Sequence, residues 1–222
     1  MKIFCVIPAY NEEETIAEVI KEVKPLVNQL VVVDDGSGDR TKHLAKTQKV
    51  ILLSHLINRG QGAALKTGTI YAVNHQADII IHFDADGQFA AEDIKKVVAP
   101  IINGEAEVVF GSRFLISQKE MTMPGLKKYL IMPLARLANR IILKVNLTDP
   151  QSGFRAMTAK VARQISWHQD RMAHCSEILF EVKRYNFKVK EVPIKVIYRH
   201  FGQRFFDGLR ILTDLIFARL LN

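Results

Sequence analysis

Short apolar runs and longer amphipathic stretches alternate along the first half of the chain. They follow one another at residues 3–7, 15–27, 30–33, 50–53, 63–74, 79–83, 91–102 and 108–110. Strands that are apolar at every position are expected where helices cover both faces of a sheet. The order therefore predicts repeated strand-helix-strand units, an α/β fold and a mostly parallel central sheet flanked by helices.

The second half begins with a different pattern, a predicted helix at about 126–145. Leucines recur on one face of it, and Arg136, Arg140 and Lys144 recur on another. This spacing is typical of a basic amphipathic helix. Such a helix either packs on the core with a solvated basic face or lies against anionic lipid headgroups.

Two further segments complete the pattern. Residues 191–198 are strand-like, and residues 205–221 are rich in Leu, Ile and Phe but carry charges at intervals. No run of about 18 uncharged apolar residues occurs, so no segment is expected to span a bilayer. We expect a C-terminal helix at 205–221 that lies on a membrane or packs on the domain.

Length and composition narrow the class of protein. A chain of 222 residues with 48% hydrophobic residues suits one globular domain and excludes a disordered protein or a disulfide-stapled miniprotein. Cys5 and Cys175 match no metal or redox spacing, so they are interpreted as ordinary thiols in a reduced compartment. The first residues are apolar too briefly for a signal peptide, which favours the cytoplasm.

A net charge of +8 predicts an anionic partner, which is a nucleic acid, a phosphorylated substrate or an acidic lipid surface. No nucleic-acid-binding signature is present, and aromatic residues do not interleave the basic stripe. Nucleic acid is therefore not expected as a partner.

The clearest chemical signal follows the apolar run 79–83. Asp84 and Asp86 stand one residue apart, with Gln88 two residues further on. Carboxylate and amide oxygens at the carboxyl end of a parallel strand can hold Mg²⁺ or Mn²⁺, which usually shares its coordination with substrate phosphates. The alternative is a solvated turn held by Asx hydrogen bonds.

Two more polar segments end strands at the same edge of the predicted sheet. Asp35 follows the strand at 30–33, where it is available to bind a base or ribose or to cap the helix that begins near residue 40. Tyr10 and Glu12 follow the first strand, where a ring and a carboxylate suit a nucleotide. Together the three strand ends predict a binding site.

The glycine-rich segment at 58–68 matches neither common phosphate-binding loop. Leu65 occupies a glycine position in both the Walker and the dinucleotide patterns. ATPase and NAD-dependent functions are therefore disfavoured, and the segment either brings backbone close to a ligand or forms a tight turn.

The motifs at residues 6–12, 33–37, 84–88, 111–113 and 149–155 resemble those of family 2 glycosyltransferases. Within that family they are most similar to dolichol- or polyprenyl-phosphate mannosyl- and glucosyltransferases. The resemblance implies a GT-A, Rossmann-like nucleotide-diphosphosugar transferase fold, inversion at the anomeric carbon and a divalent metal. It implies a single domain at 1–222, with a nucleotide-sugar half at 1–113 and an acceptor half at 114–222 that carries the amphipathic helices.

The resemblance also implies roles for individual residues. It implies that the donor is bound by Pro8, Ala9, Tyr10, Glu12, Asp35, Asp84, Ala85 and Asp86, and the metal by Asp84, Asp86 and Gln88. It places Asp149, Asp86 and Arg113 in the catalytic set. Arg113 would bind a phosphate through its guanidinium, or would form a surface ion pair. Asp149 would act as general base or as a positioning group.

Other parts of the acceptor half are less defined. The family often carries Arg-x-x-Gly-x-Ser-Lys after its late strand, where this chain keeps Arg199 but has Arg204 and Phe205 in place of Ser and Lys. With Lys127, these arginines and Arg113 are the predicted contacts to the acceptor phosphate. Glu177 either lines the same pocket or is a solvated helix charge. Several relatives end in transmembrane helices, so this chain is expected to be peripheral or to use a membrane partner.

The expected function is therefore transfer of mannose or glucose from a GDP- or UDP-sugar to polyprenyl or dolichyl phosphate at the cytoplasmic membrane face. One alternative keeps the donor chemistry with a soluble glycan acceptor, and a second is a non-catalytic nucleotide-sugar-binding protein. The sequence leaves open the sugar, the nucleotide, the lipid length, the choice between Mg²⁺ and Mn²⁺, and the oligomeric state.

Overall fold

The computed structural model describes residues 1–115, 147–171 and 173–197. The helices predicted at 126–145 and 205–221 lie outside the described residues. So do three of the predicted acceptor contacts, Lys127, Arg199 and Arg204.

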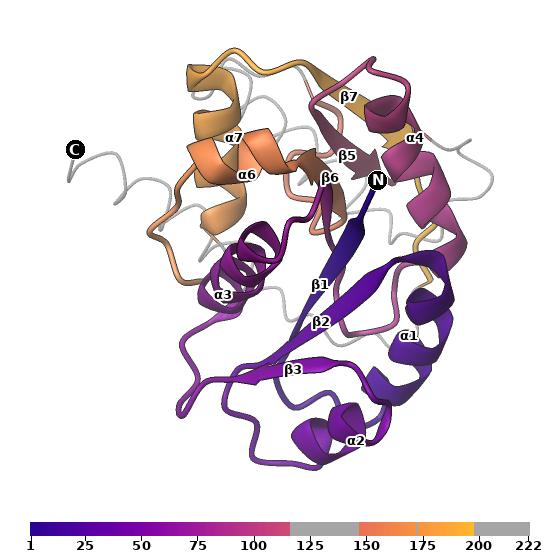
Figure 1. Ribbon diagram of the computed structural model, residues 1–222, viewed down its shortest axis with the longest axis vertical. Coiled ribbons are helices and arrows are strands. Elements are labelled where there is room, and N and C mark those ends of the chain that lie inside the picture. The colour runs from indigo at the N-terminus through magenta and orange to yellow at the C-terminus, as the bar shows by residue number, and fades with distance from the viewer. Residues whose placement is uncertain (116–146, 172, 198–222) are drawn as a thin grey trace, which may run out of the picture.

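A seven-stranded sheet forms the centre of the described structure (Figure 1). Its spatial order is β3-β2-β1-β4-β6-β5-β7. The strands are β1 Ile3–Ala9, β2 Gln29–Asp34, β3 Ile51–Ser54, β4 Ile79–His82, β5 Val108–Ser112, β6 Arg155–Thr158 and β7 Val189–Pro193. All neighbouring pairs are parallel except those that involve β6. The predicted α/β class and mostly parallel sheet are confirmed.

Helices cover both faces of this sheet, as the continuous apolar strands predicted. They are α1 Ile16–Val23, α2 Thr41–Thr47, α3 Gln61–Asn74, α4 Ile94–Ile102, α6 Ala159–Gln164 and α7 His174–Arg184, with 3₁₀ turns at Lys24–Leu26 and Ala91–Asp93. In Figure 1, α3, α6 and α7 lie on one side of the sheet, and α1, α2 and α4 lie on the other.

The strand residues divide between two hydrophobic clusters with the period of two that a pleated strand imposes. In β1, Cys5 and Ile7 pack toward α1 and α4, whereas Phe4 and Val6 pack toward α3 and α7. Each such fully buried aliphatic or aromatic side chain contributes about 1.5–3 kcal/mol. The core therefore has one layer on each face of the sheet.

Strand β6 is the element that the hydrophobic pattern did not indicate. It lies antiparallel between β4 and β5, and its first residue, Arg155, pairs with His82. Arg155 is fully buried, so a charged residue stands where a central strand is normally apolar. Because β6 runs in the opposite direction, the loop before it meets the carboxyl ends of β4 and β5.

The late strand also differs from its prediction. The expected strand at 191–198 is observed as β7, Val189–Pro193, followed by an isolated bridge between Val196 and Phe89. Strand β7 ends together with its partner, because the Ile194 N–H donates to the carbonyl oxygen of Ser112, the last residue of β5. Among the described residues, no helix has the length and apolar character needed to cross a membrane.

Helix α3 approaches the sheet closely because Gly68 has no side chain. A Cβ atom at this position would collide with Cγ1 of Val6 and come within 3.1 Å of Cγ2 of Val33. Valine side chains in a packed core cannot move aside at low cost.

We expect Gly68→Ala to lower the free energy of unfolding by about 1–3 kcal/mol, because overpacking outweighs the better helix propensity of alanine. Gly38→Ala is the control, since a Cβ atom there meets nothing within 4 Å. Urea denaturation of both variants checks the prediction. Equal unfolding midpoints for the two would contradict it.

Candidate active site

The acidic turn after β4 stands at the carboxyl edge of the sheet. The Asp86 carboxylate accepts the Gln88 N–H at 2.9 Å, and Gly87 adopts a φ of 66° that favours glycine. The turn thus has the predicted Asx hydrogen bond. This bond does not decide between a solvated turn and a metal site, because it uses only one oxygen of Asp86.

The Asp84 carboxylate is held from two sides by residues distant in sequence. Gln61, the first residue of α3, donates its side-chain N–H to Oδ1 at 2.7 Å. Gly153 lies so close that a Cβ atom there would collide with Oδ2. The sequence assigned no role to either residue: Gly153 was one position of the motif at 149–155, and Gln61 was part of the glycine-rich segment.

Three carboxylates at this edge have raised pKa values, chiefly because they are buried. Burial and the nearby charge of Asp86 raise the pKa of Asp84 to about 7. Burial also raises the pKa of Asp86. The pKa of Glu12 is raised by burial, and the charge of Asp86 adds to the shift. Closely placed carboxylates of this kind favour a cation beside them.

The donor set fits a divalent ion that shares its coordination with a ligand. Within the described parts of the chain, no three His, Cys, Asp or Glu side chains converge as a complete protein cage. Mg²⁺ and Mn²⁺ are commonly bound through one or two carboxylates plus substrate phosphates. Asp84 and Asp86 provide that number of carboxylates.

A buried polar cluster includes the first residue of β6 and lies near Asp84. Arg155 Nη2 donates to Nε2 of His174 at 3.2 Å and to Sγ of Cys175 at 3.4 Å. His174 Nδ1 lies 2.7 Å from the Arg171 carbonyl oxygen, which only accepts. The proton therefore sits on Nδ1, and Nε2 of a neutral His174 accepts from Arg155.

Cys175 is consequently not the ordinary thiol that its sequence spacing suggested. Burial by itself would raise its pKa, but the charge of Arg155, whose Nη2 lies 3.4 Å from Sγ, acts in the opposite direction. Burial does raise the pKa of Cys5, where no such neighbour acts. The interpretation as an ordinary thiol holds for Cys5 and is corrected for Cys175.

The loop after β1 brings together the residues predicted to hold a nucleotide. Pro8 and Ala9 end the strand and are buried, Ala85 is also buried, and Tyr10 is 46% exposed. The Glu12 N–H donates to Thr41 Oγ1 at 2.7 Å. The loop is therefore tied to α2, with the Tyr10 ring at the surface.

Asp35 has a structural contact that the sequence did not indicate. Its carboxylate accepts the N–H groups of Arg59 and Gly60 at 3.0 and 2.6 Å and lies 2.6 Å from Nδ1 of His55. Asp35 thus holds the loop between β3 and α3. The alternative role as a helix cap is wrong, because Asp39 accepts the Thr41 N–H at the start of α2.

The neighbouring residue Asp34 was not predicted as a site residue. It is 2% exposed, and its Oδ1 has no hydrogen-bond partner in the described part of the chain. A buried carboxylate oxygen of this kind is uncommon in native structures. At this strand end the sequence motif directed the prediction to Asp35, the next residue, and Asp34 was left out.

The glycine-rich segment contacts protein backbone. The N–H groups of Gly62 and Ala63 donate to the Asp170 carbonyl oxygen at 2.8 and 3.2 Å. A Cβ atom at Gly60 would collide with that same oxygen. The first amides of α3 are therefore already satisfied, and the glycines permit a close contact between two loops.

Glu177 holds the other side of this contact. Its Oε2 accepts the N–H groups of His168 and Gln169 at 2.8 and 2.9 Å. Glu177 is therefore neither a pocket residue nor a free solvated charge. It fixes the segment that packs against the start of α3.

Arg113 and Asp149 form a two-point ion pair at the end of β5. Nε of Arg113 lies 2.7 Å from Oδ2 of Asp149, and Nη2 lies 3.2 Å from Oδ1. Asp149 is fully buried, so this is not the surface ion pair considered as an alternative. Both oxygens of Asp149 accept from Arg113, which favours a positioning role over that of general base.

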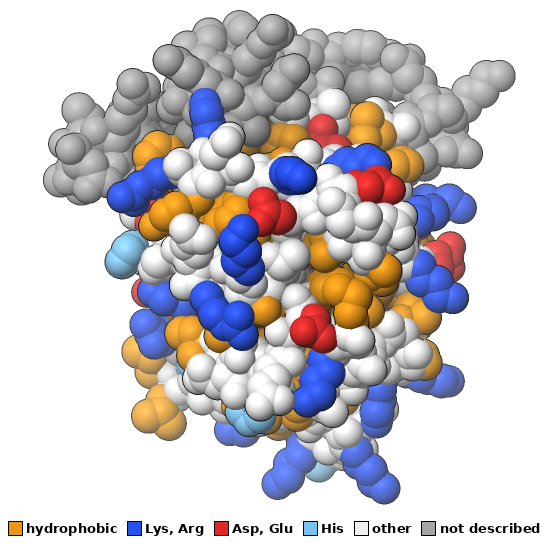
Figure 2. Space-filling view, turned by 45° about the horizontal axis from the view of Figure 1, so that its top comes forward, with side chains coloured by type: hydrophobic (Ala, Val, Ile, Leu, Met, Phe, Trp, Pro, Cys, Tyr) orange, Lys and Arg blue, Asp and Glu red, His pale blue; other side chains and the backbone are white. Residues whose placement is uncertain are grey.

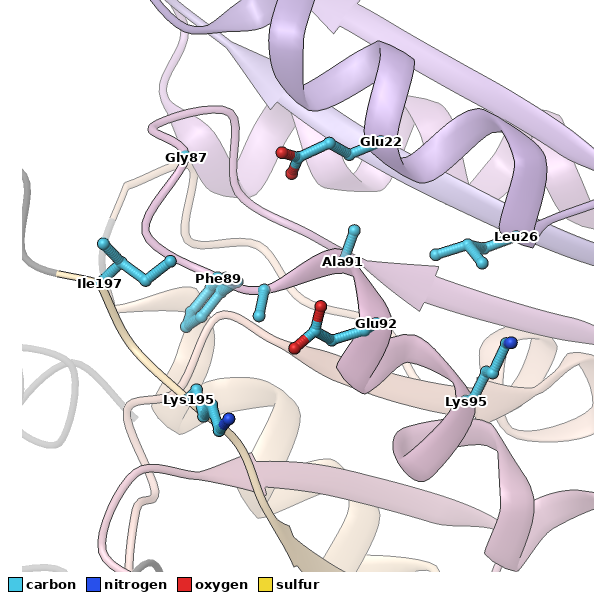
Figure 3. Close-up of a pocket in the computed structure, with 10 residues that line it drawn as sticks. Glu22, Leu26, Gly87, Phe89, Ala91, Glu92, Lys95, Lys195 and Ile197 are labelled. Atoms are coloured by element: carbon cyan, nitrogen blue, oxygen red, sulfur yellow. The ribbon is translucent and has the colours of Figure 1, made fainter. Parts of the chain in front are cut away.

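A cavity of about 560 Å³ lies behind the acidic turn (Figure 3). Its wall includes Gly87 and Phe89 of the turn, and in the close-up Glu22, Glu92 and Lys195 surround it. None of the predicted site residues that the structure describes lines it. The predicted chemistry therefore sits at the edge of the sheet, outside this cavity.

Positive charge is not concentrated in one patch of the described surface on the face shown in Figure 2. Lys and Arg side chains are spread over it, with Asp and Glu between them. This face alone gives no preference for one anionic partner.

Comparisons with known proteins identify the family to which this chain belongs. The family model described as glycosyl transferase family 2 matches residues 4–166. A UDP-N-acetylglucosamine–dolichyl-phosphate N-acetylglucosaminyltransferase of Methanococcus voltae is 34% identical over 98% of this chain and 96% of that protein. An undecaprenyl-phosphate mannosyltransferase of Micrococcus luteus is 28% identical over 93% of this chain and 88% of that protein.

A solved structure shows the same fold. Glucosyl-3-phosphoglycerate synthase from Mycobacterium tuberculosis, crystallised with Mn²⁺, UDP and glucosyl-3-phosphoglycerate, aligns with a TM-score of 0.77. The alignment covers 99% of this chain and 78% of that protein at 22% identity. The GT-A fold predicted from the motifs is confirmed.

The raised pKa of Asp84 predicts how stability depends on pH in metal-free buffer. The unfolded-state pKa is near 3.8 and the folded-state value near 7, so ionisation of Asp84 opposes folding as pH rises through this window. We expect Asp84→Asn to be more stable than the wild-type protein at pH 8, with the difference disappearing below pH 4. Urea denaturation with EDTA measures it.

Asp39→Asn is the control, because the pKa of Asp39 is shifted in the opposite direction. Hydrogen bonds from Thr41 and Glu13 outweigh burial and lower the pKa of Asp39, so its charge stabilises the fold at neutral pH. This variant should be less stable than the wild-type protein at pH 8. A loss of stability at pH 8 in Asp84→Asn as well would refute the prediction.

Proposed function

Because this chain belongs to glycosyl transferase family 2 and is a glycosyltransferase, we propose that it transfers a hexose from a nucleoside diphosphate sugar to polyprenyl or dolichyl phosphate. We further propose that the transfer inverts the anomeric carbon and takes place at the cytoplasmic face of a membrane. The lipid-phosphate acceptors in the names of two relatives support this acceptor class.

The observation that carries the proposal is one loop that contacts both halves of the site. At one end of the loop at 147–154, buried Asp149 forms an ion pair with Arg113. At the other end, Gly153 packs against Asp84. The same loop therefore contacts both a cation suited to a phosphate acceptor and a carboxylate suited to the metal of a donor diphosphate.

On the donor side, Asp84, Asp86 and Gln88 would hold the divalent metal. When bound, the metal would neutralise the charge that develops on the departing nucleoside diphosphate. Tyr10, with Pro8 and Ala9 beneath it, and Glu12 and Asp35 would hold the nucleotide. Asp35 would act through the loop that it binds, because its carboxylate already accepts two backbone N–H groups.

On the acceptor side, Arg113 would orient the lipid phosphate for attack. A phosphate oxygen forms the new bond to the anomeric carbon, and the bond from that carbon to the donor's β-phosphate oxygen breaks. The attacking oxygen is already an anion, so no proton has to be removed. Asp149 is then required to orient Arg113, which agrees with its contacts.

Transfer of labelled sugar into organic-extractable polyprenyl phosphate tests the proposal. The donor panel includes GDP-mannose, UDP-glucose and UDP-N-acetylglucosamine, each with Mn²⁺, with Mg²⁺ or with EDTA. We expect metal-dependent label in the organic phase from one donor. Label only in a soluble glycan would favour the soluble acceptor, and donor binding without turnover would favour a binding protein.

Replacement of a carboxylate of the acidic turn tests the metal assignment. Asp86→Asn should reduce turnover by at least about 100-fold, because the leaving group loses its charge stabilisation. Asp78→Asn is the control, since Asp78 lies at the amino edge before β4. Unchanged turnover of Asp86→Asn at limiting Mn²⁺ would remove Asp86 from the site.

A further inference from the structure

We infer that Glu191 is a positioning residue for Arg113, acting through Thr148 and Asp149. The inference rests on the proposed role of Arg113 in binding the acceptor phosphate. Glu191 belongs to β7, where it pairs with Phe110 of β5. It is therefore fixed on the sheet, next to the strand that ends one residue before Arg113.

The Glu191 carboxylate accepts hydrogen bonds from a loop about forty residues away in sequence. It accepts the Thr148 N–H at 2.8 Å and the Asp149 N–H at 3.0 Å. It also accepts the Thr148 hydroxyl at 3.0 Å. Hydrogen bonds to an ionised carboxylate are stronger than neutral ones, so these contacts hold the backbone at 148–149 firmly.

The hydroxyl groups of Ser112 and Thr148 form a chain of hydrogen bonds in which each donates toward Glu191. Because a hydroxyl has one proton and Thr148 gives its proton to Glu191, Ser112 must donate to Thr148 Oγ1, 2.6 Å away. Ser112 Oγ in turn accepts the Phe114 N–H at 3.2 Å. Glu191 is the acceptor at which this chain of hydrogen bonds from the residues flanking Arg113 ends.

The same anchor fixes the direction of the Arg113 side chain. Asp149, whose N–H is bound to Glu191, grips Nε and Nη2 of Arg113. Its carboxylate also accepts the Arg113 N–H at 3.3 Å. Without Glu191, the N–H groups of Thr148 and Asp149 lose their acceptor, and Asp149 no longer has one fixed position from which to hold the guanidinium.

Glu107 supplies a matched control on the same pair of strands. It precedes β5 at the opposite edge of the sheet, where its carboxylate accepts the Lys188 N–H at 3.1 Å and Lys160 Nζ at 2.8 Å. Glu107 and Glu191 thus both tie backbone near β5 and β7. Only Glu191 contacts the loop that holds Arg113.

The first test separates acceptor binding from donor binding in steady-state kinetics. Glu191→Ala should raise the KM for polyprenyl phosphate about tenfold or more and leave the donor KM within about twofold, because the donor half keeps its contacts. Glu191→Gln, which keeps one acceptor oxygen, should recover much of the loss. Glu107→Ala should leave both KM values unchanged. Equal effects of Glu191→Ala and Glu107→Ala would overturn the inference.

A double-mutant cycle then tests whether Glu191 acts through Arg113. In the Arg113→Lys background, Glu191→Ala should change the acceptor KM by less than about twofold, since the two substitutions disable the same contact. Multiplicative effects would show that Glu191 acts independently, and the inference would be wrong.

Hydrogen exchange measures the anchor without any turnover. Glu191→Ala should lose protection in the peptide that spans residues 147–154, whereas Glu107→Ala should retain it. If the wild-type protein forms no lipid product, the proposed function is wrong, and this arm alone decides whether Glu191 holds the loop. Equal hydrogen-exchange protection of this peptide in the wild-type protein and both variants would show that Glu191 does not hold the loop.

Discussion

The antiparallel register between β4 and β6 is the constraint on which the site depends. His82 pairs with Arg155, and two residues further along the same register Gly153 stands opposite Asp84. A side chain at 153 and the Asp84 carboxylate cannot occupy the same space. This register also delivers the loop at 147–154 to the end of β5, where Asp149 meets Arg113. A shift of one residue would separate all of these groups.

The edge of the sheet concentrates charge that does not favour folding by itself. Asp84, Asp86 and Glu12 all have raised pKa values, chiefly because the protein removes their hydration. Arg155 supplies a buried positive charge near Asp84 and is itself held by His174. The fold thus keeps carboxylates together at some cost in stability, which is the usual relation between stability and a binding site for a cation.

Carboxylates also give the irregular parts of the site their shape. Asp35 accepts backbone N–H groups at 59–60, Glu177 at 168–169 and Glu191 at 148–149. Loops at a sheet edge have no ladder to satisfy their amides, so side-chain acceptors replace it. Because each acceptor sits on, or at the end of, a helix or strand, the loops inherit the rigidity of the sheet and its helices.

The sequence by itself determined the parallel strands, the helices up to α4 and the acidic turn at Asp84 and Asp86, because these depend on local periodicity and on strand ends sharing one edge. Only the tertiary structure decided the place of β6 and the partners of Gly153, Asp35 and Glu191. Those partners are set by register and packing between segments far apart in the chain. Arg155 interrupts the apolar pattern of β6, and its contacts with His174 and Cys175 form only when the chain is folded.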